Sequence, residues 1–113
     1  MSKKVLNSKE ALELHFRLNP KELELKKIRT ANYRAMESGL NISCLTYKEW
    51  ISLLRKYKFS CLKCGQHEPR IVLVMDHIVP LSKGGTSDIT NIQPLCQTCN
   101  ASKGNKTTDY RLE

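Results

Sequence analysis

The chain has no long apolar stretch. Nothing in its 113 residues approaches the ~18 consecutive apolar residues that a membrane-spanning helix needs. We also expect no signal peptide, because residues 1–4 lead into a mixed polar segment without an apolar run. We therefore expect a soluble, cytoplasmic protein with no membrane contact.

Acidic residues are comparatively few, and the formal net charge is +8. The excess is uneven: residues 1–60 carry 13 Lys and Arg against 6 Asp and Glu, whereas residues 61–113 carry 6 against 5. A basic surface attracts acidic partners, and phosphate neutralisation supplies most sequence-independent binding of nucleic acid. The alternative is a charged face that only keeps the protein solvated. We predict that the N-terminal half contacts nucleic acid.

Four of the five cysteines form two C-x-x-C pairs, Cys61–Cys64 and Cys96–Cys99. A disulfide framework is one interpretation, but without an export signal such pairs are more typical of thiolate metal ligands. A site with four cysteine ligands leaves no position for water, so the zinc it predicts is structural. The fifth cysteine, Cys44, is interpreted as a bystander to the metal site.

Local signals predict helices in the first half of the chain and strands in the second. Residues 8–19 fit a short helix with sparse apolar spacing, and Asn19-Pro20 predicts the start of a helix that ends near residue 38. The sequence from Thr46 to Glu49 is a capping box that opens a helix through about residue 56. Strands are predicted at 71–75 and 92–95, and a last helix at 97–104. This order predicts an α+β fold.

One predicted helix has an apolar face, and the helix before it has a basic face. Trp50, Leu53 and Leu54 recur at helical spacing, which predicts core packing rather than base stacking for Trp50. In the preceding helix, a basic face could lie along a phosphate backbone; the residues predicted to contact nucleic acid there are Lys26, Lys27, Arg29 and Arg34.

The cysteine pairs enclose 31 residues, more than the ~15–20 of a compact four-cysteine module. This insert reads DHIVPLSKGG from Asp76 to Gly85, then Asn91, and is followed by CQTCNASKGN from Cys96 to Asn105. Motifs in this order resemble the HNH endonuclease family, and most closely its zinc-containing, phage-encoded members. The resemblance covers residues 45–106 and implies a ββα-metal (His-Me finger) core, in which two strands and a helix surround one catalytic divalent ion.

The resemblance also implies roles that agree with the chemistry of the residues. His77 suits proton transfer near neutral pH and by similarity is the general base. Asp76 is a hard oxygen donor suited to Mg²⁺, Mn²⁺ or another divalent ion. Asn91 is implied to bond the loop backbone and orient His77. Asn100 replaces the family's last histidine, which makes an H-N-N variant, and is implied to share the ion with Asp76.

Three further expectations concern the geometry of Asp76 and His77 and the roles of the neighbouring lysine and the other histidines. Neighbouring residues on a regular strand face opposite ways, so Asp76 and His77 reach one site only if the strand ends or bends near Pro80. Lys103 lies one turn after Asn100, where its ammonium could reach a phosphate. No role is predicted for His15 or His67.

Together these features predict a metal-dependent endonuclease that hydrolyses DNA by nicking or double-strand cleavage. The boundaries expected are a basic helical arm over residues 1–44, the nuclease domain over 45–106 and a tail over 107–113. The resemblance implies a 5′-phosphate product, a bacterial or phage-infected host cell and a possible terminase partner; the protein is expected to be a monomer or homodimer. The alternatives are a non-catalytic zinc module that binds nucleic acid, and a helper subunit that cleaves only with a partner.

Overall fold

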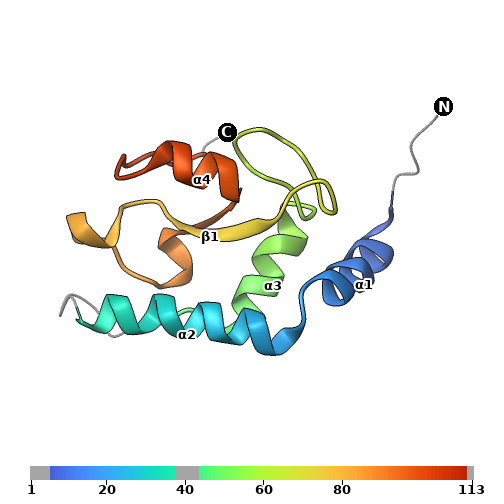
Figure 1. The fold of residues 1–113 in the computed structure, drawn as a ribbon, viewed down its shortest axis with the longest axis horizontal. Coiled ribbons are helices and arrows are strands. Elements are labelled where there is room, and N and C mark those ends of the chain that lie inside the picture. The colour runs from blue at the N-terminus through green and yellow to red at the C-terminus, as the bar shows by residue number, and fades with distance from the viewer. Residues whose placement is uncertain (1–5, 38–43, 112–113) are drawn as a thin grey trace.

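The computed structural model describes residues 6–37 and 44–111, which form an α+β fold (Figure 1). Its elements in chain order are the helices α1 (Ser8–Leu18), α2 (Lys21–Glu37) and α3 (Tyr47–Lys56), the strand β1 (Leu73–His77), the 3-10 helices η1 (Leu81–Lys83) and η2 (Ile89–Asn91), the strand β2 (Ile92–Cys96) and the helix α4 (Gln97–Lys103). The predicted end of α2 near residue 38 lies outside the described residues. No helix in the described ranges is long and apolar enough to cross a membrane.

Capping residues decide where two of the helices begin. Thr46 accepts a hydrogen bond from the backbone of Glu49, whose carboxylate bonds back to Thr46, so the predicted capping box is confirmed. The same reciprocal pair forms between Asn7 and Glu10 at the start of α1. This cap compensates for the sparse apolar spacing of α1, since it satisfies backbone donors that a helix start leaves unpaired.

The sheet consists of β1 and β2, which pair antiparallel. Asp76 lies opposite Gln93, and His77 opposite Ile92. In Figure 1, β1 runs between α4 on one side and α2 on the other. Because successive side chains alternate between faces, Asp76 bonds to α4 and His77 bonds on the α2 side. The strand ends at His77. This agrees with the expectation that Asp76 and His77 can reach one site only if the strand ends or bends near them.

The core joins the helices, the sheet and the cysteine pairs. Trp50 and Leu54 are fully buried and Leu53 nearly so, which confirms the predicted packing face of α3. The same cluster contains residues of α2, the sheet and the cysteine pairs: Ile28, Leu73, Ile92, Leu95, Cys61, Cys96 and Cys99. Three of the four paired cysteines are therefore continuous with the apolar core, whereas Cys64 is exposed.

A buried ionic cluster attaches α1 and α2 to the rest of the fold. His15 on α1 bonds to Glu24 on α2 through Nε2, and its Nδ1 lies 2.8 Å from the Glu68 carboxylate. Trp50 donates its indole N–H to Glu24 at 2.9 Å, and Asn19 donates to Glu68. Burial by itself lowers the pKa of His15, but the hydrogen bonds to the two carboxylates outweigh burial and raise the pKa to about 9. An imidazolium with both ring nitrogens donating therefore joins α1, α2 and the segment before β1.

A second contact, between α2 and the start of α3, is made by Asn32 and Leu45. The Asn32 amide donates to the Leu45 carbonyl at 2.9 Å and accepts from the Leu45 N–H at 3.0 Å. With the ionic cluster, this bidentate contact fixes α2 along its length. The basic residues of α2 are thus held in a defined position relative to β1.

Candidate functional site

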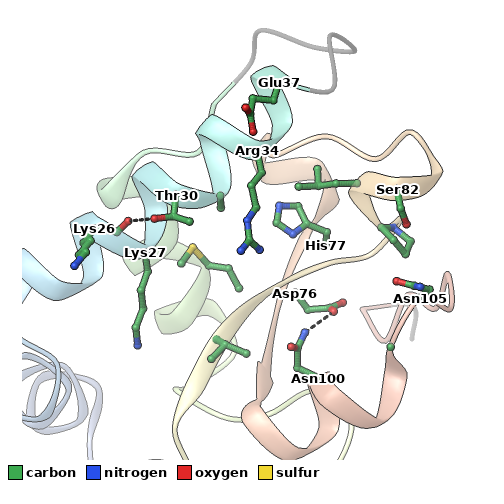
Figure 2. Close-up of a pocket in the computed structure, with 16 residues that line it drawn as sticks. Lys26, Lys27, Thr30, Arg34, Glu37, Asp76, His77, Ser82, Asn100 and Asn105 are labelled. Atoms are coloured by element: carbon green, nitrogen blue, oxygen red, sulfur yellow. Dashed lines mark hydrogen bonds between the residues drawn. The ribbon is translucent and has the colours of Figure 1, made fainter.

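A cleft of about 940 Å³ lies between α2 and the β1–α4 unit (Figure 2). Lys26, Lys27 and Arg34 enter it from α2. The opposite side is formed by polar residues of β1, η1 and the chain around α4: Asp76, His77, Ser82, Asn100 and Asn105. Figure 2 shows Arg34 reaching from α2 toward His77, with Asp76 and Asn100 below them. One cavity therefore contains cations, a carboxylate and an imidazole.

Asp76 is buried, and both of its oxygens accept hydrogen bonds. Oδ1 accepts from Asn100 Nδ2 at 2.8 Å, and Oδ2 accepts from Gln93 Nε2 at 2.8 Å. The Lys103 ammonium lies 3.3 Å from Oδ2 and also donates to the His77 carbonyl at 3.0 Å. These contacts hold the carboxylate in one orientation and balance its charge.

The position of Lys103 differs from the sequence-based expectation. Its side chain is 1% exposed, with the ammonium turned inward to Asp76. A buried lysine needs a partner for its charge, and Asp76 is the partner. We therefore do not count Lys103 among the residues that offer charge to a phosphate.

Asp76 and Asn100 are adjacent groups whose oxygens suit a hard divalent ion. Mg²⁺ commonly uses one or two carboxylates together with substrate phosphates and keeps several waters. An asparagine amide can present either its oxygen or its nitrogen, and hydrogen-bonding partners decide which. The pair therefore fits an ion held weakly by the protein and completed by the substrate, in competition with the Lys103 ammonium.

His77 is partly buried beside the cleft, and Nε2 lies 2.8 Å from the Ser87 hydroxyl. Burial lowers the pKa of His77 below its ordinary value; Asp76 opposes this shift, whereas Lys103 and Arg34 add to it. The imidazole is therefore neutral at neutral pH. A neutral imidazole has one unprotonated nitrogen, which a proton acceptor requires.

The loop from Val79 to Thr86 is held by Asn91. Asn91 Oδ1 accepts from the Val79 N–H at 2.9 Å, and Nδ2 donates to the carbonyls of Val79 at 3.0 Å and Thr86 at 2.8 Å. Gly85 allows this closure, since a Cβ there would lie 1.7 Å from the Val79 oxygen. These side-chain hydrogen bonds of Asn91 go to the backbone and not to the imidazole, so they hold the loop that leads to Ser87.

The basic residues of α2 differ in their relation to the cleft. Lys26, Lys27 and Arg34 are exposed and line it, whereas Arg29 is exposed on α2 but is not among the lining residues. Arg29 therefore extends the charged surface beyond the cleft.

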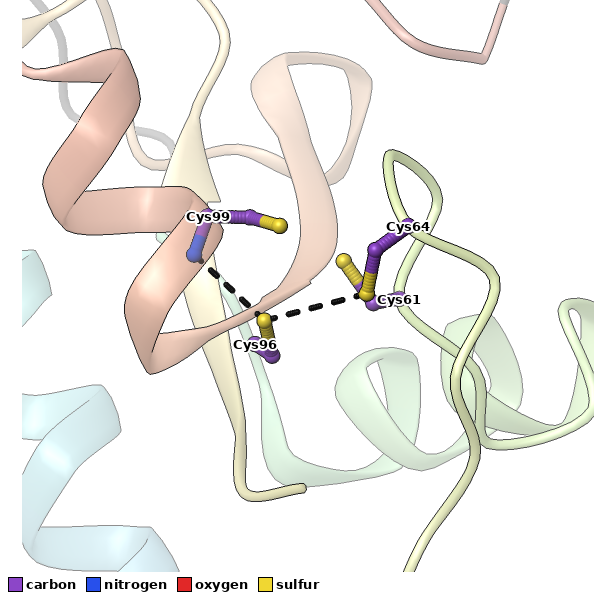
Figure 3. Close-up of side chains that lie close together, drawn as sticks. All are labelled: Cys61, Cys64, Cys96 and Cys99. Atoms are coloured by element: carbon purple, nitrogen blue, oxygen red, sulfur yellow. Dashed lines mark hydrogen bonds between the residues drawn. The ribbon is translucent and has the colours of Figure 1, made fainter. Parts of the chain in front are cut away.

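The four cysteine sulfurs form one cluster (Figure 3), all within 4.8 Å of one another. Cys64 Sγ lies 4.0 Å from Cys96 Sγ. Tetrahedral zinc with Zn–S bonds of ~2.3 Å would place the sulfurs about 3.8 Å apart, so the spacing fits that ion. Cys44, the fifth cysteine, is exposed and outside the cluster.

Without a bound cation, the close packing of the four sulfurs opposes full ionisation of the cluster. Burial and the three neighbouring sulfurs raise the pKa of the Cys99 thiol to about 12. Thiolates this close repel one another unless a cation neutralises them, and metal ligation deprotonates coordinating thiols. The Cys99 N–H also donates to Cys96 Sγ at 3.4 Å, and the Leu62 N–H donates to the Pro94 carbonyl at 3.1 Å. The cluster thus joins the first cysteine pair to β2 and to the start of α4, which carries Asn100.

Sequence reasoning missed the roles of five buried polar residues: Ser87, Gln93, His15, Glu24 and Glu68. Ser87 bonds His77, and Gln93 bonds Asp76 and the Thr108 carbonyl, while His15 forms the ionic cluster. The available signal was weak: Gln93 is a polar residue inside an apolar strand, and Ser87 is one of several small polar residues in a loop.

Comparison with known proteins agrees with this geometry. A family model described as HNH endonuclease matches residues 61–106, which contain both cysteine pairs, Asp76, His77, Asn91 and Asn100. The matched region is therefore similar to an HNH endonuclease domain, and this similarity supports nuclease activity in general. The match begins at residue 61, so α3, which the resemblance had included from residue 45, lies before it. Searches of curated proteins and of solved structures found no match.

Proposed function

We propose that the protein is a metal-dependent DNA endonuclease, an H-N-N variant of the HNH type with a structural zinc. The observation that carries the proposal is the cleft, where a neutral imidazole and the Asp76–Asn100 pair face a row of basic side chains. A general base, hard oxygen donors and phosphate-neutralising cations are the three components that phosphodiester hydrolysis requires.

In the reaction, His77 accepts a proton from water as the water oxygen attacks phosphorus. The phosphorus–oxygen bond to the 3′-oxygen breaks; this oxygen leaves with the bonding electron pair and takes a proton from solvent, and the phosphate stays on the 5′-oxygen. A divalent ion, when held by Asp76 and Asn100, would polarise the phosphate and stabilise the leaving oxygen. Gln93 and Lys103 keep the Asp76 carboxylate in place, and Asn91 keeps the loop beside His77 closed.

DNA would lie against α2, because its exposed cations open into the same cleft as the reacting groups. Contacts from Lys26, Lys27, Arg29 and Arg34 to phosphates position the duplex but carry no direct sequence information. We therefore propose binding with strong salt dependence and little sequence preference. Each phosphate contact that is lost by substitution should reduce the salt slope by roughly 0.9.

The biological setting is proposed from the resemblance to phage-encoded members of the family. It is genome processing in the cytoplasm of a phage-infected or bacterial cell, with terminase as partner. One candidate catalytic site in the described part of the chain favours nicking by a monomer, and double-strand cleavage would need a homodimer.

The second candidate is a zinc-stabilised module that binds nucleic acid without cutting it. One observation favours it: the Asp76 carboxylate is already paired with the buried Lys103 ammonium. A divalent ion would have to compete with this contact. A helper subunit that cuts only with a partner is a variant of the same idea.

Plasmid nicking with Mg²⁺, Mn²⁺ and other divalent ions, measured beside DNA binding, separates these candidates. His77→Ala should lower the cleavage rate by ~10²–10⁴-fold, the contribution of a general base, and leave binding unchanged. His67→Ala is the matched control, because His67 is exposed and does not line the cleft. Binding without cleavage by the wild type under every ion would establish the binding module, unless an added terminase restored cutting.

A further inference from the structure

Ser87 connects the candidate general base to helix α2. It is fully buried, and its Oγ lies 2.8 Å from His77 Nε2 and 3.1 Å from the Ala31 carbonyl oxygen of α2. Ala31 itself lines the cleft, one residue after Thr30 and three before Arg34. A single hydroxyl therefore bridges the base and the helix that carries the basic residues.

The direction of these two hydrogen bonds follows from their chemistry. A hydroxyl has one proton, and a carbonyl oxygen can only accept. The Ser87 proton is therefore donated to Ala31, so the Ser87 oxygen accepts from His77. His77 Nε2 must carry the ring proton of the neutral imidazole, which leaves Nδ1 with the free lone pair.

We propose that Ser87 is a positioning residue that fixes both the tautomer and the ring orientation of His77. The inference rests on the proposed function, since it assigns Nδ1 as the nitrogen that accepts the proton of water. Ser87 in turn depends on the loop closed by Asn91 and Gly85, because Asn91 bonds the carbonyl of the preceding residue, Thr86.

In this arrangement α2 helps to orient the catalytic base and also carries the proposed DNA-binding surface. The Ala31 carbonyl is fixed in the helix, so it determines which way the Ser87 proton points. Any displacement of α2 from β1 would release this constraint and let His77 populate the other tautomer. The basic side chains that hold DNA and the carbonyl that orients the base thus belong to one rigid element.

Steady-state cleavage kinetics on the zinc-loaded full chain test the catalytic part. Ser87→Ala should lower kcat by roughly 10- to 100-fold, with KM for DNA unchanged, because loss of orientation affects the chemical step. Ser87→Thr keeps the hydroxyl and should recover most of the rate. Ser60→Ala is the control: it also removes a serine hydroxyl bonded to a backbone carbonyl, that of Tyr57, away from the cleft.

The tautomer is read separately by ¹⁵N NMR of the histidine rings, at a pH where the imidazole is neutral. The wild type should show His77 protonated on Nε2, and Ser87→Ala should show a mixture of tautomers. This measurement does not depend on cleavage activity. The wild-type spectrum alone tests the predicted tautomer, so the test does not require that a variant folds.

The outcomes are distinct. An Nδ1–H tautomer in the wild type, or a Ser87→Ala protein with unchanged tautomer and kcat, would overturn the role of Ser87. If the wild type never cuts DNA but its tautomer depends on Ser87, the positioning contact stands and the nuclease function is lost.

Discussion

Replacing His15 with glutamine should remove a pH-dependent part of the stability. In the folded protein, His15 donates to Glu24 and Glu68, and these bonds outweigh burial to raise its pKa from 6.5 to about 9. Because the folded state binds this proton more tightly, the stabilisation is fully present below pH 6.5 and is lost as the pH rises toward about 9. The difference between the two pKa values corresponds to about 3 kcal/mol.

The assay is denaturant unfolding of the wild type and His15→Gln in excess zinc, over a series of pH values that spans this range. Thiolate ligands bind zinc more tightly as the pH rises, so zinc binding stabilises the fold more at high pH, which is opposite to the effect of His15. This zinc effect is common to the wild type and the variant. The difference between their unfolding free energies therefore isolates His15. Below pH 6.5 the variant should be the less stable by at least about 3 kcal/mol, since it also leaves two buried carboxylates without a cation.

His67→Gln is the control for this comparison, because His67 is exposed and lies outside the cluster. Its unfolding free energy should follow that of the wild type at every pH. Parallel curves for the wild type and His15→Gln would refute the buried imidazolium. They would also leave the Asn32–Leu45 contact and the core packing of Ile28 as the contacts that fix α2.

Three further perturbations test the site and its support. Chelation of the metal, or Cys99→Ser, should abolish the cooperative thermal unfolding transition that circular dichroism monitors, because three of the cysteine ligands lie within the core. A chelator without effect would contradict a structural ion. Gly85→Ala should lower both the melting temperature and the cleavage rate, since its Cβ would lie 1.7 Å from the Val79 oxygen and the loop would have to open; wild-type values for both would show that the loop is less closed. Lys103→Met should cost about 3–5 kcal/mol in urea unfolding, because it leaves the Asp76 charge buried and unpaired; a neutral result would indicate a solvated Asp76.

The sequence predicted a helix or strand well where contacts between residues close in the chain determine it. The capping box at Thr46 and the apolar spacing of Trp50, Leu53 and Leu54 determine where α3 begins and which face it buries. The first strand was predicted at residues 71–75 but spans Leu73–His77. The shift arises because pairing defines the strand: Leu73 lies opposite Cys96, after which β2 gives way to α4. The limits of β1 thus depend on partners that lie 15 residues away (His77 and Ile92) and 23 residues away (Leu73 and Cys96), which local propensity does not describe.

The sequence by itself determined the chemical components: four thiol ligands, an Asp-His pair, two asparagines and a basic N-terminal half. Motif order is enough for these, because spacing along the chain limits which groups a small fold can bring together. Only the tertiary structure decided how they are used. It turned Lys103 inward to Asp76 and placed His15 against Glu68, 53 residues away. It also linked His77 to α2 through Ser87, whose partner Ala31 is 56 residues from Ser87 in the chain. Contacts of that separation depend on how α1 and α2 pack onto the sheet, and this packing leaves no periodic pattern in the sequence.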